Sequence, residues 1–259
     1  MNDKMLFLFD VDGTLIDTET HQIPLSTITA LQQLHKQGHL LGISTGRSLP
    51  SLKNGGFASL IDWDFFLCNN GQAIFNKKQE ILHLACIPQA SVEKCMQVAH
   101  AQQNPILIIH GEGEYLTAAP NELVYQALDF FKELVPEVKP YDGQPVIMMI
   151  AYGPLQYDYA SYHEIDGIHI IPGLSTYADI VLKDYHKYKG IQYLLKHLQM
   201  DSYIAFGDSL NDVEMLTHAA IGIAMGNAHE DVKAIADYVT TKVSEDGILQ
   251  ALDVYKRQG

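Results

Sequence analysis

The sequence predicts an α/β fold in which a core of parallel strands is interrupted by an inserted α+β domain. Short apolar runs alternate with helical segments over residues 1–81, and this alternation resumes over residues 187–259. Strands that alternate with helices are joined by right-handed crossovers and form a parallel sheet. Between these parts, residues 82–186 contain helices and strand-like runs in a different order, which indicates a separate insert.

The elements of the first core segment follow from its apolar runs. Leu6 to Phe9 is an uninterrupted apolar run of the length typical of a strand buried on both faces. The next elements expected are a helix around residues 24–37, a strand over 40–43, a helix after Arg47 and a strand over 65–68.

The insert mixes helices and strands. We expect helices at residues 91–103 and 121–134, the second starting at Asn121 as its cap, and strands at 105–110, 115–118, 146–152, 168–171 and 178–182. A chain of 259 residues is long enough for one large domain or two modest ones.

Two aspartates follow the first strand directly, in the run MLFLFDVDGT from Met5 to Thr14. Ligands of parallel sheets bind just beyond the carboxyl ends of the strands, and alternation along an extended chain turns Asp10 and Asp12 toward the same side. Gly13 allows the backbone to turn sharply behind them. Converging carboxylates repel each other unless a cation or a proton lies between them, and hard oxygen ligands of this kind favour Mg²⁺ over Zn²⁺ or Ca²⁺.

Two other interpretations of these aspartates are a calcium loop and a hydrogen-bonded turn. An EF-hand requires a preceding helix and a glycine further along its loop, whereas Gly13 follows Asp10 closely and lies behind a strand. The calcium loop is therefore excluded. If this motif is considered alone, the interpretation as a turn that uses the aspartates for its own hydrogen bonds remains open. Three further segments weigh against that interpretation.

The first of these segments follows the strand over residues 40–43 and reads Ser44-Thr45-Gly46-Arg47. Hydroxyl and backbone N–H groups at a strand-to-helix turn can bind an anion, and Gly46 allows close approach of a phosphate oxygen. Thr45 is the expected phosphate contact, although such pairs also cap helices. Arg47 could bind phosphate or form a structural ion pair.

The second segment is IAFGDSLNDVEML, Ile204 to Leu216, in which an apolar strand again ends in an aspartate. Asp208 can join the first two aspartates around one cation. Asn211 can donate its amide to a phosphate oxygen, and Asp212 can orient water or a lysine behind the ligands. The helix that begins at Asn211 and Asp212 is expected to carry apolar residues at Val213, Leu216 and Ala220.

The third segment, HKYKGIQYLLKHL, offers two lysines. The helix here carries an apolar stripe that starts at Ile191 and faces the sheet. Lys187 lies four residues before Ile191, near that stripe, whereas Lys189 lies two residues before it, on roughly the opposite face. Lys187 is the expected site residue, and Lys189 is expected to be solvated.

Together, DVDGT, STGR, the lysine segment and GDSLND resemble the four motifs of the haloacid dehalogenase (HAD) superfamily. CNNGQ, from Cys68 to Gln72, and AMGNAHEDVKAIADYVT, from Ala224 to Thr240, are similar to its Cof-type sugar-phosphatase branch. The resemblance covers about residues 4–81 and 187–252. It implies a Rossmann-like core, residues 1–81 and 187–259, and a large C2-type cap, residues 82–186, that closes over the site and selects the substrate.

The resemblance also implies residue roles. Asp10 would form an aspartyl-phosphate, and Asp12 would act as acid and base. The Mg²⁺ ligands would be Asp10, Asp208 and the backbone carbonyl of Asp12, and the phosphate contacts would be Thr45, Gly46, Lys187 and Asn211.

In the family, the catalytic lysine lies just after an acid-Ile strand, here Asp179-Ile180, which favours Lys187. The Lys-Gly pair found in many relatives instead falls at Lys189-Gly190.

The implied activity is Mg²⁺-dependent hydrolysis of small phosphorylated metabolites such as sugar phosphates. A phosphomutase of the same superfamily would use the same intermediate and is the main alternative. A non-catalytic protein that binds a phosphorylated ligand is a weaker alternative, because it would need neither an acid/base nor a large lid.

The net charge of −14 argues against nucleic acid and anionic membranes as partners, since both attract basic surfaces. The same negative charge repels a phosphorylated substrate. Bound Mg²⁺, Lys187 and Arg47 are therefore expected to make the electrostatic potential positive at the site. We expect a small-molecule substrate and a monomer or weak homodimer.

The cysteines and the N-terminal residues indicate the cellular compartment of the protein. Cys68, Cys86 and Cys95 are odd in number and lack metal-ligand spacing, so we expect packing residues in a reduced, cytoplasmic protein. No signal peptide or membrane span is expected, because the first apolar run is too short.

Some residues of the insert could contact substrate. Tyr157, Tyr159 and Tyr162 could stack on a sugar, but we expect them in the core of the insert. His110, Glu112 and Glu114 lie in a predicted glycine-rich turn that could reach the substrate.

Overall fold

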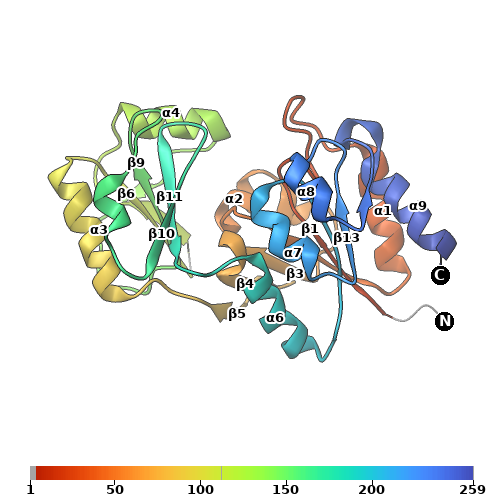
Figure 1. Cartoon of the computed structure of the whole chain (residues 1–259). Coiled ribbons are helices and arrows are strands. Elements are labelled where there is room, and N and C mark those ends of the chain that lie inside the picture. Colours follow the sequence, from red (N-terminus) through yellow and green to blue (C-terminus); the bar gives the residue numbers. More distant parts are fainter. Residues whose placement is uncertain (1–3, 112, 259) are drawn as a thin grey trace. The chain divides into compact units, whose positions relative to one another are not determined.

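The computed structural model describes residues 4–111 and 113–258, and its chain forms two compact units (Figure 1). Unit 1 comprises Met1–Arg47, Gly55–His83 and His186–Gly259, and unit 2 comprises Ser48–Asn54 and Leu84–Tyr185.

A sheet of eight strands, in the order β14-β13-β12-β1-β2-β3-β4-β5, forms the centre of unit 1. The strands are β1 (Leu6–Phe9), β2 (Leu40–Ser44), β3 (Phe65–Cys68), β4 (Ala73–Asn76), β5 (Ile81–Leu84), β12 (Ile204–Gly207), β13 (Ile221–Ala224) and β14 (Tyr238–Val239). From β14 to β3 each described pairing is parallel, whereas β4 runs antiparallel to β3. The predicted parallel core is confirmed, and the fully buried β1 lies inside it because all four of its side chains are apolar.

Helices cover both faces of this sheet (Figure 1). They are α1 (Leu25–Lys36), α6 (Lys187–Leu198), α7 (Val213–Thr217), α8 (Glu230–Ile235) and α9 (Gly247–Gln258). Leu6 and Leu8 belong to the same hydrophobic cluster as Ile191 and Leu194 of α6, so the apolar stripe of that helix faces the sheet as predicted. On the other face, the ring of Phe7 contacts Tyr255 of α9.

Two expectations for unit 1 need correction. The helix after Asp212 is short: a 3₁₀ turn, Leu210–Asp212, leads into α7, which ends at Thr217. Ala220 therefore lies beyond the helix, where its backbone N–H bonds to Tyr203 beside the sheet. The hairpin of β3 and β4 was not predicted, although the turn between them, Asn69–Gly71, contains the Asn-Gly pair that is common in hairpins.

Unit 2 contains a sheet of six strands in the order β10-β11-β9-β6-β7-β8. The strands are β6 (Ile106–His110), β7 (Gly113–Leu116), β8 (Glu137–Val138), β9 (Met148–Tyr152), β10 (Ile168–Pro172) and β11 (Tyr177–Leu182), and the helices are α2 (Leu49–Asn54), α3 (Gln89–Ala101), α4 (Glu122–Phe131) and α5 (Ala160–His163). α4 starts at the predicted cap, since the Asn121 side chain accepts a hydrogen bond from the Val124 N–H.

The core of unit 2 lies on one face of this sheet. Cys95 of α3 belongs to it, as do Tyr159 and Tyr162, and Tyr157 packs against it. The tyrosines are thus core residues, as expected. His110 and Glu114 lie in the paired strands β6 and β7 instead of the predicted turn, and Glu112 lies outside the described residues.

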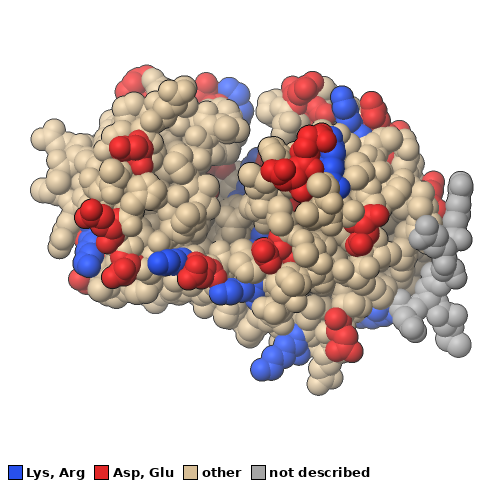
Figure 2. Space-filling model, viewed as in Figure 1, with Lys and Arg blue, Asp and Glu red and all other residues tan. Residues whose placement is uncertain are grey.

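Acidic side chains outnumber basic ones over the whole chain, 31 to 17, and Figure 2 shows them spread over the drawn face among Lys and Arg. Within residues 4–111 and 113–258, no helix has the length and apolar character needed to span a bilayer.

Candidate active site

The site is built on two neighbouring parallel strands. Phe9 of β1 is in register with Phe206 of β12, and the Asp10 N–H bonds to the Phe206 carbonyl at 3.0 Å. Asp10 and Asp208 each follow the end of their strand, so the parallel register brings these two carboxylates to the same edge of the sheet.

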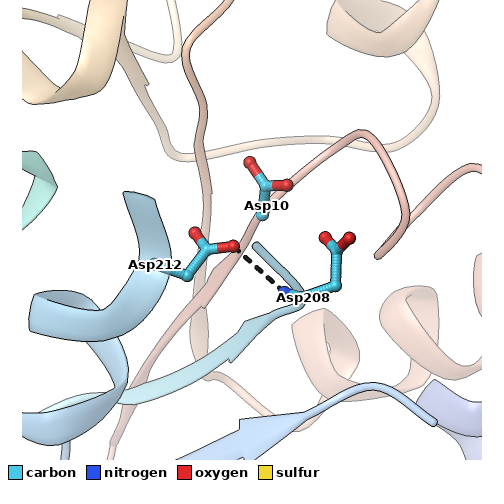
Figure 3. A group of neighbouring side chains, drawn as sticks. All are labelled: Asp10, Asp208 and Asp212. Atoms are coloured by element: carbon cyan, nitrogen blue, oxygen red, sulfur yellow. Dashed lines mark hydrogen bonds between the residues drawn. The ribbon is translucent and has the colours of Figure 1, made fainter. Parts of the chain in front are cut away.

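Asp10, Asp208 and Asp212 form a group in which one carboxylate oxygen from each residue lies within 4.8 Å of the others (Figure 3). Burial raises the pKa of Asp10 well above its ordinary value, and the Lys187 ammonium only partly opposes this. Burial, and then the charge of Asp212, raise the pKa of Asp208 to about 7. Carboxylates in such surroundings are stabilised in their charged form when a cation binds between them.

Lys187 is completely buried in this group. Its Nζ donates to Oδ1 of Asp10 at 2.6 Å and to Oδ1 of Asp212 at 2.7 Å. Burial lowers the pKa of this lysine, but the charges of Asp10 and Asp212 outweigh burial and raise it, so Lys187 is cationic. Lys189 is exposed, as the helical-face argument predicted.

Asp212 acts as a structural anion in this arrangement. Its Oδ1 accepts from Lys187 and its Oδ2 accepts from the backbone N–H of Ser209 at 3.1 Å. The same Oδ2 also accepts from the backbone N–H of Asp208 at 3.0 Å (Figure 3). Both of its oxygens are thus engaged by protein donors. Asp10 and Asp208 are the members better suited to hold a cation, and their hard oxygen donors fit Mg²⁺.

Gly13 leaves room for Asp208. Its φ is +83°, and a Cβ at this position would lie 2.2 Å from an Asp208 carboxylate oxygen. The loop is held from two sides: Asn227 donates to the Gly13 carbonyl at 2.7 Å, and the Thr14 hydroxyl donates to Asp208 at 3.1 Å. The glycine predicted for a sharp turn is therefore also required by the close approach of the second strand end.

The carboxylate of Asp12 lies outside the group of three, which contains Asp212 where the sequence predicted Asp12. Arg47 explains the difference: its Nε and Nη2 donate to the two oxygens of Asp12, each at 2.7 Å. Arg47 thus pairs with the predicted acid/base residue. The backbone carbonyl of Asp12 as a metal ligand remains a prediction.

The predicted phosphate contacts gather beside these carboxylates. Thr45 is buried, and its Oγ1 accepts from the Arg47 N–H at 3.1 Å, which forms a tight turn around Gly46. Asn211 is exposed and donates from Nδ2 to Oδ1 of Asn70 at 3.0 Å. Asn70 lies within CNNGQ, and no role was predicted for it. Its only sequence signal was that resemblance.

A match to a family model decides the family of this chain. Residues 7–252 match the model of the haloacid dehalogenase-like hydrolases. The chain belongs to this family. The resemblance of its four motifs to the HAD superfamily is thereby confirmed, as is the prediction of a HAD-type hydrolase.

Several known proteins are similar to this chain over almost their whole length. YkrA of Bacillus subtilis (strain 168) is 29% identical over 262 residues, which cover 97% of each chain. A crystal structure from Geobacillus kaustophilus HTA426 superposes with a TM-score of 0.89 at 27% identity, covering 98% of this chain and 99% of that one. The structure of BT4131, described as a HAD subclass IIB sugar phosphatase, has a TM-score of 0.82 at 32% identity, with the same coverage.

Proposed function

We propose that this HAD-family hydrolase is a Mg²⁺-dependent phosphatase that acts on small phosphorylated metabolites, with sugar phosphates as the first candidates. The observation that carries the proposal is the arrangement of the buried Asp10 and Lys187 with the partly buried Asp208, in which a carboxylate lies beside both an ammonium and a second carboxylate suited to a metal. The description of BT4131 as a sugar phosphatase supports the substrate class.

Asp10 would attack phosphorus in line and form an aspartyl-phosphate, which divides hydrolysis into two easier steps. Lys187, held by Asp212, would place its ammonium against the phosphoryl oxygens, with Thr45, Gly46 and Asn211 as further contacts. Asp10, Asp208 and the backbone carbonyl of Asp12 would hold Mg²⁺, which neutralises charge on the non-bridging oxygens when bound.

Asp12 would protonate the leaving oxygen and then accept a proton from the attacking water. Both oxygens of this carboxylate accept hydrogen bonds from Arg47, and it lies outside the group of Asp10, Asp208 and Asp212. Arg47, which lies beside Asp12, would be a further contact for the phosphorylated substrate.

The insert predicted at residues 82–186 would act as the cap that selects the substrate and excludes bulk water. We assign His110, Glu112 and Glu114 to this unit as candidates for substrate contact. A monomer or weak homodimer in the cytoplasm completes the proposal.

A phosphatase screen tests the proposal. The chain is incubated with Mg²⁺ and a panel of sugar phosphates, nucleotides, flavin mononucleotide and pyridoxal phosphate, and released phosphate is measured. Asp10→Asn should abolish release while the fold survives, since removing a nucleophile costs on the order of a million-fold. Asp62→Asn, at an exposed position, is the matched control.

The products separate the alternatives. Isomerised hexose phosphate without free phosphate would favour a phosphomutase, and ligand binding without turnover would favour a binding protein. An Asp10→Asn variant with activity within tenfold of the parent would contradict the covalent mechanism.

A further inference from the structure

The turn between β3 and β4 has an unusual backbone. Asn69, Asn70 and Gly71 have φ values of 52°, 55° and 85°, which places three successive residues in the left-handed region. Residues with a Cβ are disfavoured there, and asparagine tolerates this region better than most. Such a backbone persists only where surrounding contacts hold it, and it is often found at functional sites.

The contacts that hold this turn come from the proposed active site. The Asn70 N–H bonds to the Thr45 carbonyl at 2.9 Å, and the Asn69 N–H bonds to the Arg47 carbonyl at 3.0 Å. Gly71 lies against α6, where a Cβ would be 3.0 Å from the Lys187 carbonyl oxygen. The turn therefore contacts both the phosphate-binding segment and the lysine helix.

The side chain of Asn70 extends this contact to a third segment. Asn70 is only 9% exposed, and its Oδ1 accepts from Nδ2 of Asn211 at 3.0 Å. The other end of the Asn211 amide, Oδ1, accepts from the Ser209 hydroxyl at 2.6 Å. Because both ends have partners, the Asn211 amide has one preferred orientation. Its Nδ2 carries two hydrogens, so one remains for a ligand.

The space beside Gly46 lies next to both amides. A Cβ at Gly46 would lie 3.5 Å from Oδ1 of Asn70 and 3.9 Å from Nδ2 of Asn211. A ligand oxygen approaching the backbone of Gly46 would thus meet an amide donor whose direction is already fixed. Fixing a donor before the ligand arrives removes the entropy cost of ordering it during binding.

We propose that Asn70 is a positioning residue that orients the Asn211 amide toward the phosphoryl group. This inference deepens the proposed function and rests on it. Asn70 acts through Asn211, so removing the Asn70 side chain should matter only while Asn211 is present. If Asn70 only stabilised the turn, the effect of removing it would be independent of Asn211.

A double-mutant cycle distinguishes these roles. Asn70→Gly removes the side chain and keeps the left-handed backbone accessible. We expect it to lower kcat/KM about threefold to tenfold, the range of one hydrogen bond. In the Asn211→Ala background, the same substitution should change kcat/KM less than twofold, because coupled residues are not additive. Equal effects in both backgrounds would overturn the inference.

Asn69→Gly is the matched control, since it makes the same change one residue earlier in the same turn. Whatever its effect, that effect should be the same with and without Asn211. If Asn211 were coupled to Asn69 as strongly as to Asn70, the positioning role would belong to the turn as a whole. That result would overturn the inference.

A binding measurement keeps this inference separate from the proposed function. Affinity for inorganic phosphate in the presence of Mg²⁺ is measured by calorimetry for the same variants. If the parent protein turns over no substrate but the Asn70–Asn211 coupling appears in phosphate affinity, the phosphatase proposal fails and the positioning role stands. If the parent is active and both measurements are additive, only the positioning role fails.

Discussion

At the residue scale, Lys187 shows how burial and charge are balanced in the site. A fully buried ammonium is costly unless it is paired and hydrogen-bonded. Two carboxylates, Asp10 and Asp212, bond to it at 2.6 and 2.7 Å. Asp212 in turn is held by backbone N–H groups, so Lys187 has a fixed anchor that does not depend on the nucleophile. The lysine can therefore keep its position while Asp10 reacts.

The two lysines of α6 should respond differently to truncation. Lys187→Ala removes a charge contact from a buried site, and we expect a loss of about 2–4 kcal/mol of transition-state stabilisation, by analogy with lost oxyanion donors. Lys189→Ala, at an exposed position, should change transition-state stabilisation by about 1 kcal/mol or less. The test compares kcat/KM of both variants on one good substrate, after circular dichroism has confirmed folding. The reverse order would show that Lys189 is the catalytic lysine.

Asp12→Asn should discriminate between leaving groups. A sugar alkoxide needs a proton to leave, so its hydrolysis should fall by roughly a hundred to ten-thousand-fold. The hydrolysis of aryl phosphates, whose leaving groups need no proton, should fall by a smaller factor. Parallel kcat measurements on a sugar phosphate and an aryl phosphate check this. Equal losses would mean that Asp12 is not the acid.

At the element scale, the position of Lys187 depends on how closely α6 approaches the turn after β3. Gly190 is on the buried side of α6, and a Cβ there would lie 2.5 Å from the Gly71 carbonyl oxygen and 2.8 Å from its Cα. Both neighbours are backbone atoms that cannot rotate away. The glycine of the Lys189-Gly190 pair is thus required for helix packing, which explains its presence beside an exposed lysine.

Gly190→Ala should therefore move α6 and weaken the site. We expect overpacking to cost about 1–3 kcal/mol of unfolding free energy and to lower kcat, because Lys187 lies one turn away. Denaturant unfolding and kcat are both measured. Gly113→Ala is the control, since a Cβ at that position would have no atom of the described residues outside its chain neighbours within 4 Å. A variant of Gly190 with unchanged stability and kcat would contradict the packing argument.

At the scale of the whole molecule, the buried carboxylates link stability to pH and metal. The pKa of Asp208 is about 7 in the folded protein against an ordinary 3.8. Between these values the folded state holds a proton that the unfolded state has released. The contribution of Asp208 to stability is therefore greatest at acidic pH and is lost as pH rises through 7. A cation that binds the ionised carboxylate would restore stability above that pH.

Mg²⁺ should accordingly raise the melting temperature more at pH 8 than at pH 5.5. At a concentration of a hundred times its dissociation constant, a ligand adds about 2.7 kcal/mol to the free energy of unfolding. For a chain of this size, this raises the melting temperature by roughly 5–10 °C. Scanning calorimetry with Mg²⁺ or with EDTA at both pH values measures the difference. In Asp208→Asn the pH dependence of the Mg²⁺ effect should shrink. An equal Mg²⁺ effect at both pH values in the parent protein would count against Asp208 as a ligand.

The sequence by itself determined the parallel core, the succession of its first strands and helices along the chain, and the family. These follow from local signals: uninterrupted apolar runs mark buried strands, and the residues after each strand end carry the motifs. The apolar stripe from Ile191 also selected Lys187 over Lys189, because helical periodicity fixes which side faces the sheet.

Only the tertiary structure decided which side chains meet. Asp12 pairs with Arg47, Asp212 joins the carboxylate group, and Asn70 reaches Asn211 across 141 positions of sequence. Each contact depends on strand register and on turns that bring distant segments to one edge of the sheet. Local periodicity cannot specify such contacts, because it records the face on which a residue lies and not the residue that lies opposite.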